Sequence, residues 1–97
     1  MFSYDDDKRE QTLRKHGIDF LDAAEVFASE HLLLPARSEI EQRQIAIGYV
    51  EGIAIAVVFT IRDDSIRIIT ARRARKNERE AYHTHVAQRD AENEKPN

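Results

Sequence analysis

The sequence contains no cysteine, and this absence excludes several classes of protein at once. Without a thiol there is no disulfide scaffold, no thiolate zinc site and no cysteine nucleophile. No run of about 18 or more apolar residues is present, so no transmembrane helix is predicted. Residues 1–7 are acidic where a secretory signal would be basic and then apolar, which favours a cytoplasmic protein that does not act at a membrane. The sequence also lacks a glycine-rich loop of the kind that cradles a phosphate.

Length and charge narrow the remaining possibilities. A chain of 97 residues, 41% of them hydrophobic, suits one domain, which we place at residues 1–89 with a polar tail at 90–97. The formal net charge of -3 argues against a protein whose whole surface binds nucleic acid. Residues 62–79, however, contain seven basic residues against three acidic ones. The sequence therefore predicts one basic face on an acidic molecule.

Two helices are predicted near the N-terminus. Residues 2–4 indicate a short strand, and the carboxylates of residues 5–7 favour the start of a helix that ends at about His16. Gly17 can adopt the left-handed conformation that ends a helix. Asp19 is an N-cap candidate for a second helix, whose apolar residues share one face that should lie in the core: Phe20, Ala23, Ala24 and Phe27.

The middle of the chain predicts a sheet. Residues 31–34 form a short apolar strand that Pro35 should end, and residues 36–41 are polar and predict a loop. Glu51-Gly52 predicts a hairpin turn between two further strands. Those strands and the one after them are expected at residues 45–50, 53–60 and 66–71. Because residues 53–60 are apolar on both faces, this strand should be central.

From about Arg72 to Arg89 the pattern becomes helical, with few apolar residues to pack against the sheet. The elements together indicate an α+β fold with two N-terminal helices, a central antiparallel sheet of three to four strands and a C-terminal helix.

Lys15-His16-Gly17 has two interpretations. As structure it is an ordinary helix C-terminus, with basic groups in the last turn and glycine after them. As chemistry it places a cation beside an imidazole that titrates near neutral pH, so His16 is a candidate for moving a proton to or from a ribose hydroxyl or a leaving oxygen.

The arginines of residues 62–79 are equally open to two interpretations. Ile66 and Ile68 should face away from Arg67, which places its guanidinium on the face shared with Ile69 and Ala71. There it is either a salt-bridge partner or a clamp that stabilises charge on a phosphate. Arg72 and Arg73 follow at the junction of strand and helix, where anions are also favoured.

Aromatic residues and histidines complete the candidates. Tyr82 and Tyr49 either stack on an exposed base or fill the boundary between sheet and helix. His83 and His85 are two residues apart on a predicted helix and should point in different directions, so they do not suggest a metal site. We expect no metal and no other cofactor.

Four stretches of the sequence resemble the BrnT family of toxins, in the family's order, from Tyr4 to Tyr82. Tyr4-Asp5 with Lys8, and then Lys15-His16-Gly17, is similar to the family's aromatic-Asp-Pro-x-Lys opening and its Lys-His-Gly. Residues 20–27 are similar to its Phe-x-x-Ala-x-x-Val-Phe helix. Arg43 with Ile47-Gly48 is similar to its Arg-x-x-x-Ile-Gly, and residues 67–74 with Glu78-Arg79 and Tyr82 form the most diagnostic segment. The sequence departs from the family's common residues at Asp6, Thr12 and Gln44, where proline, asparagine and an aromatic are usual.

The resemblance implies a RelE-like fold and a metal-independent endoribonuclease that arrests growth. It also implies a BrnA-type ribbon-helix-helix antitoxin that neutralises the toxin, and repression of their operon by the complex, in which the antitoxin alone contacts operator DNA. The catalytic candidates are His16 for proton transfer and Arg67 for transition-state charge, supported by Lys15, Arg72 and Tyr82. The candidates for RNA binding are Lys8, Arg43, Arg62 and Arg73.

Two alternatives from other classes remain open in the sequence. One is a catalytically inactive co-repressor, which would keep its binding to the antitoxin and lack cleavage. The other is a plain nucleic-acid-binding module that uses residues 62–79, which would bind intact RNA or DNA in a salt-sensitive way.

Overall fold

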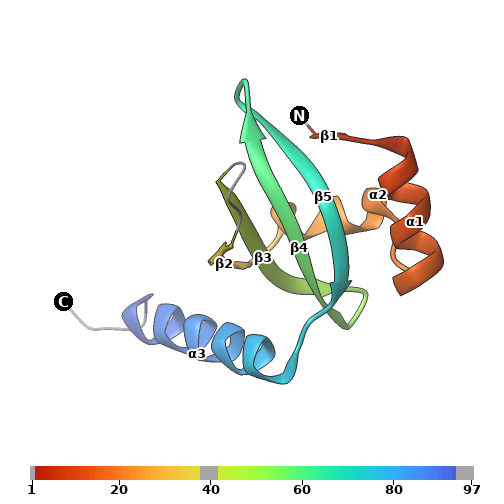
Figure 1. Ribbon diagram of the computed structural model, residues 1–97. Helices are drawn as coiled ribbons and strands as arrows, with labels where there is room; N and C mark the ends of the chain where they lie inside the picture. Colours follow the sequence, from red (N-terminus) through yellow and green to blue (C-terminus); the bar gives the residue numbers. More distant parts are fainter. Residues whose placement is uncertain (1, 38–41, 94–97) are drawn as a thin grey trace.

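The computed structural model describes residues 2–37 and 42–93, which form a twisted sheet with helices packed around it (Figure 1). The five strands are β1 (Phe2–Tyr4), β2 (Leu32–Ala36), β3 (Arg43–Val50), β4 (Ile53–Arg62) and β5 (Ser65–Arg73). Their order across the sheet is β1-β5-β4-β3-β2. The helical elements are α1 (Asp6–His16), α2 (Phe20–Ala23), the 3-10 helix η1 (Ala24–Ala28) and α3 (Lys76–Asn93).

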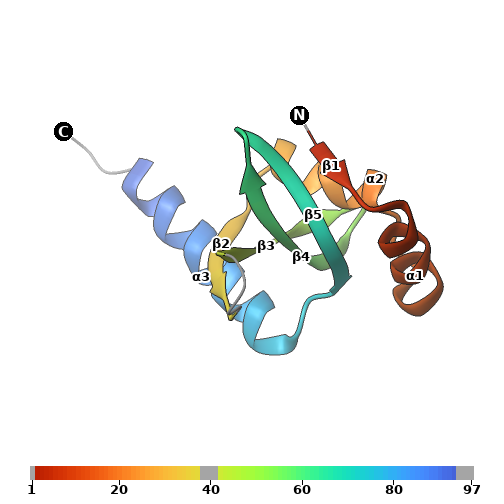
Figure 2. The same ribbon diagram turned by 45° about the horizontal axis from the view of Figure 1, so that its top comes forward.

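This architecture confirms the α+β class but corrects the sheet. The described residues form five strands rather than three to four. The sheet is mixed, because β1 pairs in parallel with β5 while the other neighbours are antiparallel. Figures 1 and 2 show α1 beside β5 and α3 near β2 and β3, toward the other edge of the sheet. No helix in the described ranges is long and apolar enough to cross a membrane.

Local signals set both ends of α1 and the start of α2 as predicted. The Asp5 carboxylate accepts hydrogen bonds from the backbone N–H groups of Asp7 and Lys8 and so caps α1. At the other end Gly17 has φ +70°, and its N–H donates to the Leu13 carbonyl oxygen at 2.9 Å. Asp19 caps α2 through the Leu21 N–H.

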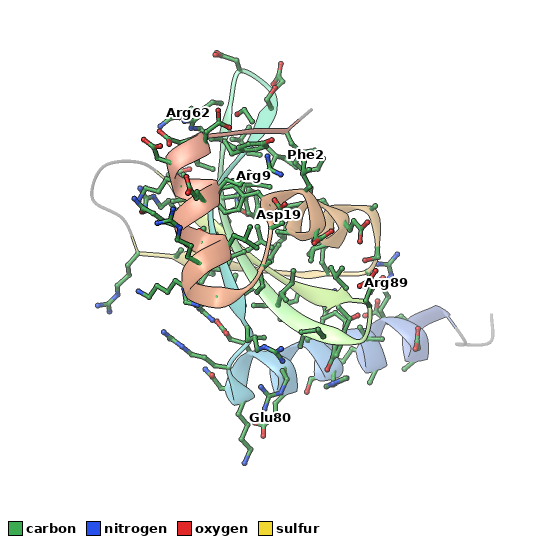
Figure 3. The ribbon with its side chains drawn as sticks, turned by 90° about the vertical axis from the view of Figure 1, so that its right-hand side faces the viewer. Phe2, Arg9, Asp19, Arg62, Glu80 and Arg89 are labelled. Atoms are coloured by element: carbon green, nitrogen blue, oxygen red, sulfur yellow. The ribbon has the colours of Figure 1, made fainter. Side chains whose placement is uncertain are left out.

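Asp19 also joins the two helices. Its carboxylate accepts two hydrogen bonds from the Arg9 guanidinium, at 2.7 and 3.0 Å, and Figure 3 shows the two side chains side by side. This pairing with Arg9 lowers the pKa of Asp19. Because α1 has only one buried residue, Thr12, polar contacts of this kind carry much of its attachment to the rest of the protein.

The second predicted helix tightens into η1 at Ala24. A 3-10 helix has three residues per turn, so Val26 lies on the same side of the chain as Ala23. The fully buried side chains of this segment are Phe20, Ala23 and Val26. Phe27 is only partly buried, with its ring 4.9 Å from that of Phe59. The apolar face therefore packs on the sheet as predicted, but the residue at its end is Val26.

The central position of β4 is confirmed. On one face Ile55, Val57 and Phe59 join the larger core with Phe20. On the other face Ala56 packs with Ile47 and Ala74 in a smaller core that α3 covers through Tyr82. The predicted β3–β4 hairpin is also confirmed: Glu51 and Gly52 both have positive φ, at 51° and 78°.

The prediction that Pro35 ends a strand is wrong. Strand β2 continues through Pro35 to Ala36, paired with Gln44 and Arg43 of β3. Because β2 is an edge strand, it tolerates a residue that has no backbone N–H. Of the predicted loop 36–41, residues 38–41 lie outside the described residues.

Both ends of the C-terminal helix are also corrected. Strand β5 continues through Arg72 to Arg73, and α3 begins only at Lys76. The helix then runs to Asn93, so residues 90–93 are helical rather than part of a frayed tail. Residues 94–97 lie outside the described residues.

Candidate functional site

Cationic side chains from α1 and β3 surround one surface hollow, which we call the α1 hollow. Its volume is ≈ 280 Å³. The α1 side is lined by Lys8, Gln11, Thr12, Lys15 and His16. The sheet side is lined by Arg43, Ile69 and Thr70. Four residues predicted from the sequence as site residues thus meet at one place: Lys8, Lys15, His16 and Arg43.

Helical spacing explains the α1 side of this hollow. Residues three and four apart lie on the same face of a helix, so Lys8, Gln11 and Lys15 project together. Thr12 lies between them and is 4% exposed. Its Oγ1 is 3.3 Å from Oγ1 of Thr70 on β5, which holds this face of α1 against the sheet.

Arg67 lies on the sheet face that carries the α1 hollow. It pairs with Thr60 of β4, and Thr70 pairs with Val58, two residues before Thr60 on the same strand. Gln44 of β3 pairs with Phe59 of β4, so the next position along this register places Arg43 beside Thr60, on the side away from Arg67. Two arginines therefore flank Thr60, with Cα atoms about 10 Å apart, which is twice the spacing of adjacent strands.

The predicted neighbours of Arg67 on this face are partly wrong, because β5 contains a bulge. Val58 pairs with Thr70 and Phe59 with Ile68, which leaves Ile69 as an extra residue. The extra residue reverses the alternation beyond it, so Ala71 joins Ile68 in the larger core instead of sharing a face with Arg67. Arg67 itself is half-buried.

Arg72 lies on the same face but is engaged by Glu78. Two hydrogen bonds, at 2.7 and 2.9 Å, join its guanidinium to the carboxylate, which also accepts the Arg75 N–H at 2.7 Å. The Glu78 side chain is only 7% exposed. The hydrogen bonds from Arg72 lower the pKa of Glu78, and those to Glu78 raise the pKa of Arg72. The pair fixes the start of α3 against β5.

Tyr82 also lies away from the α1 hollow. It packs on the smaller core, its ring lies 5.3 Å from that of Tyr49, and its hydroxyl lies 3.5 Å from the Glu30 carbonyl oxygen. Burial raises the pKa of the Tyr82 hydroxyl. The supporting role of this side chain in catalysis stays a prediction.

The basic segment does not form one face, which corrects the prediction from charge alone. Arg72 pairs with Ala56 and Arg73 with Ile55, so these neighbours project from opposite faces of β5. Arg62 pairs with Ser65 at the β4–β5 turn, at the end of the sheet far from α3 (Figure 3). The roles of Arg62 and Arg73 in RNA binding stay predictions.

The sequence interpretation missed four residues that line the α1 hollow: Gln11, Thr12, Ile69 and Thr70. The spacing of Lys8, Gln11 and Lys15 along one helix face carried the signal for Gln11. The Thr12–Thr70 contact joins residues 58 positions apart, so no local pattern indicates it. Across residues 2–37 and 42–93, no group of three or more His, Cys, Asp or Glu side chains is arranged to hold a metal ion.

Comparison with known proteins identifies the family to which this fold belongs. The family model described as "Ribonuclease toxin, BrnT, of type II toxin-antitoxin system" matches residues 4–78. The crystal structure of the Brucella abortus ribonuclease toxin BrnT has 32% sequence identity and a TM-score of 0.63, over 78% of this chain and 99% of that one. No curated protein matches the chain significantly.

These matches define the class as a ribonuclease toxin of a type II toxin–antitoxin system with a RelE-like α+β fold. The chain belongs to the BrnT family. The family match ends at Glu78, so most of α3 lies beyond it.

Proposed function

We propose that the α1 hollow is the RNA-cleaving site of a metal-independent endoribonuclease. One observation carries the proposal: His16 meets three cationic side chains, Lys8, Lys15 and Arg43, at a single hollow. An imidazole supplies proton transfer near neutral pH, and the surrounding cations favour a bound phosphate. Arg67 lies on the same sheet face and adds a guanidinium.

The reaction needs only groups that RNA and these side chains supply. The 2′-oxygen of the substrate ribose attacks the adjacent phosphorus, and the bond from phosphorus to the 5′-oxygen breaks. One proton leaves the 2′-hydroxyl and one reaches the departing 5′-oxygen; His16 moves one of them and solvent water exchanges the other. Lys15 and Arg67 stabilise the charge that grows on the phosphate oxygens. The product is a 2′,3′-cyclic phosphate and a 5′-hydroxyl.

The remaining site residues act around this centre. Lys8 and Arg43 hold phosphates next to the one being cut, while Arg62 and Arg73 contact more distant parts of the strand. Arg72 and Tyr82 act through the fold, because Arg72 is paired with Glu78 and Tyr82 packs in the smaller core. They keep α3 and β5 in place rather than touching the reacting atoms.

The partner in this proposal is a BrnA-like ribbon-helix-helix antitoxin, which covers the basic hollow with acidic side chains and so stops cleavage. Free toxin degrades cytoplasmic RNA and arrests growth. The complex represses its own operon, with the antitoxin providing the contacts to operator DNA. The family match supports a type II antitoxin partner.

Incubating the purified chain, free of antitoxin, with matched RNA and DNA single strands in excess chelator tests the proposal. We expect the RNA to be cut and the DNA to stay intact, because only RNA offers the 2′-hydroxyl. Loss of cleavage in chelator and its return with a divalent ion would reject metal independence. Salt-sensitive binding to both strands without cleavage would instead favour a nucleic-acid-binding module.

A further inference from the structure

Three surface hollows adjoin one another in series through shared lining residues, His16 between the first two and Ile53 and Arg73 between the last two. His16 lines both the α1 hollow and a second one of ≈ 160 Å³ beside the β3–β4 hairpin, which we call the hairpin hollow. Arg73 lines the hairpin hollow and a third one of ≈ 360 Å³, between the hairpin and the start of α3, which we call the α3 hollow. Figures 1 and 3 show the end of α1 and the start of α3 at the same end of the sheet. The candidate catalytic histidine is thus connected to the start of α3.

The α3 hollow is lined by two arginines and by Tyr49, which contacts His83 next to the hollow. Arg73 and Arg79 line it and are both exposed, and the Arg79 guanidinium also donates to the Ala74 carbonyl oxygen at 2.8 Å. Tyr49 lines the same hollow, and its hydroxyl lies 2.9 Å from Nε2 of His83 on α3. Their ring centroids are 5.7 Å apart, and the His83 side chain is exposed.

The Tyr82 ring packs against both members of the Tyr49–His83 pair. Its centroid lies 5.3 Å from that of Tyr49 and 5.4 Å from that of His83, while Tyr82 itself packs on the smaller core. A fixed ring pair at the surface can stack on a base without losing conformational freedom when it binds. Guanidinium groups beside it bind the phosphates of the same strand.

The charges in the hairpin hollow limit the orientation in which an RNA strand can bind there. The Asp22 and Glu51 carboxylates line this hollow together with Arg73. Carboxylates repel phosphate and accept hydrogen bonds from ribose hydroxyls and base amino groups. A strand that passes His16 therefore turns its sugar or base toward Asp22 and Glu51, and its next phosphates toward Arg73 and Arg79.

We propose that the α3 hollow is a second nucleotide subsite, at which single-stranded RNA leaving the α1 hollow stacks a base on Tyr49 and His83 and places phosphates on Arg73 and Arg79. This rests on the α1 hollow being the cleavage site. The subsite extends the family domain, because His83 lies in the part of α3 beyond the family match.

Binding of short and long strands tests the subsite independently of catalysis. The probes are 2′-fluoro RNA strands of about four and about twelve nucleotides, which lack the hydroxyl needed for cleavage. For His83→Ala and Arg73→Gln we expect Kd for the long strand to rise about fivefold or more, with a smaller rise for the short strand. Arg73→Gln should also reduce the slope of log Kd against log salt by about 0.7, the value for one phosphate contact on a single strand.

Arg14→Gln is the matched control for charge, because it removes one exposed arginine that pairs with Glu10 on α1. Its long-strand Kd should stay within about twofold of wild type, since surface substitutions away from a binding site change little. Equal losses on the two strands, unchanged Kd in both variants, or variants that lose affinity for the antitoxin alone would overturn the subsite. If the wild-type chain fails to cut RNA while the length-dependent losses remain, the catalytic proposal fails and the subsite stands.

Discussion

Replacing His16 with alanine is expected to lower the rate of RNA cleavage by about a hundredfold or more, because general acid–base groups contribute factors of about 10² to 10⁴. The melting temperature should stay nearly unchanged, since His16 is only half-buried at the end of α1 and belongs to neither core. The measurement is the single-turnover cleavage rate beside thermal melting. A folded variant with the full rate would show that proton transfer occurs elsewhere.

Arg67→Ala belongs to the same experiment, with Arg14→Ala as the control that also removes one guanidinium. We expect Arg67→Ala to melt like wild type and to cut RNA at least about tenfold more slowly, because charge stabilisation on the phosphate is lost. Arg14→Ala should keep both properties. If Arg67→Ala unfolds the protein while Arg14→Ala does not, Arg67 is a structural residue and its place in the mechanism is wrong.

Phe20→Ala should have the largest effect on stability. The Phe20 side chain is 0% exposed, and it packs α2 onto the sheet face formed by Val57 and Ile68. Removing a buried phenyl ring costs about 3 to 5 kcal/mol, a large part of the total stability of about 5 to 15 kcal/mol for a small domain. Toxicity should then fall because little folded protein remains.

Leu21→Ala is the matched control for this substitution. Leu21 is the next residue in α2 and is 55% exposed, so its replacement should change the free energy of unfolding by no more than about 0.5 kcal/mol. Urea unfolding of both variants measures the difference. Equal destabilisation by the two substitutions would contradict the packing of α2 described here.

Features of the fold that depend on neighbouring residues could be predicted from the sequence. Asp5, Gly17 and Asp19 cap their helices because capping involves only backbone groups within a few positions. The Glu51-Gly52 turn follows from the same local chemistry. The count of strands depended on tertiary pairing: β1 is three residues long and is held by β5, more than sixty residues later in the chain.

The sheet side of the site could not be predicted in the same way. Simple alternation along β5 fails at Ile69, and nothing in the sequence Ile68-Ile69-Thr70 marks which residue the bulge leaves unpaired. Arg72 and Arg73 look alike in sequence, yet the fold pairs Arg72 with Glu78 and directs Arg73 to the opposite face. The α1 side was accessible to sequence reasoning, because Lys8, Lys15 and His16 belong to one short helix.

The chemical ends of the RNA products test the central claim most directly. Wild-type protein is incubated in excess chelator with an RNA strand, and with the same strand carrying one 2′-deoxynucleotide on the 5′ side of the cut, and the fragments are weighed by mass spectrometry. Cleavage through the 2′-hydroxyl predicts a 5′ fragment ending in a 2′,3′-cyclic phosphate and no cut in the substituted strand. Fragments ending in a 3′-hydroxyl, or undiminished cutting beside the deoxynucleotide, would contradict the account.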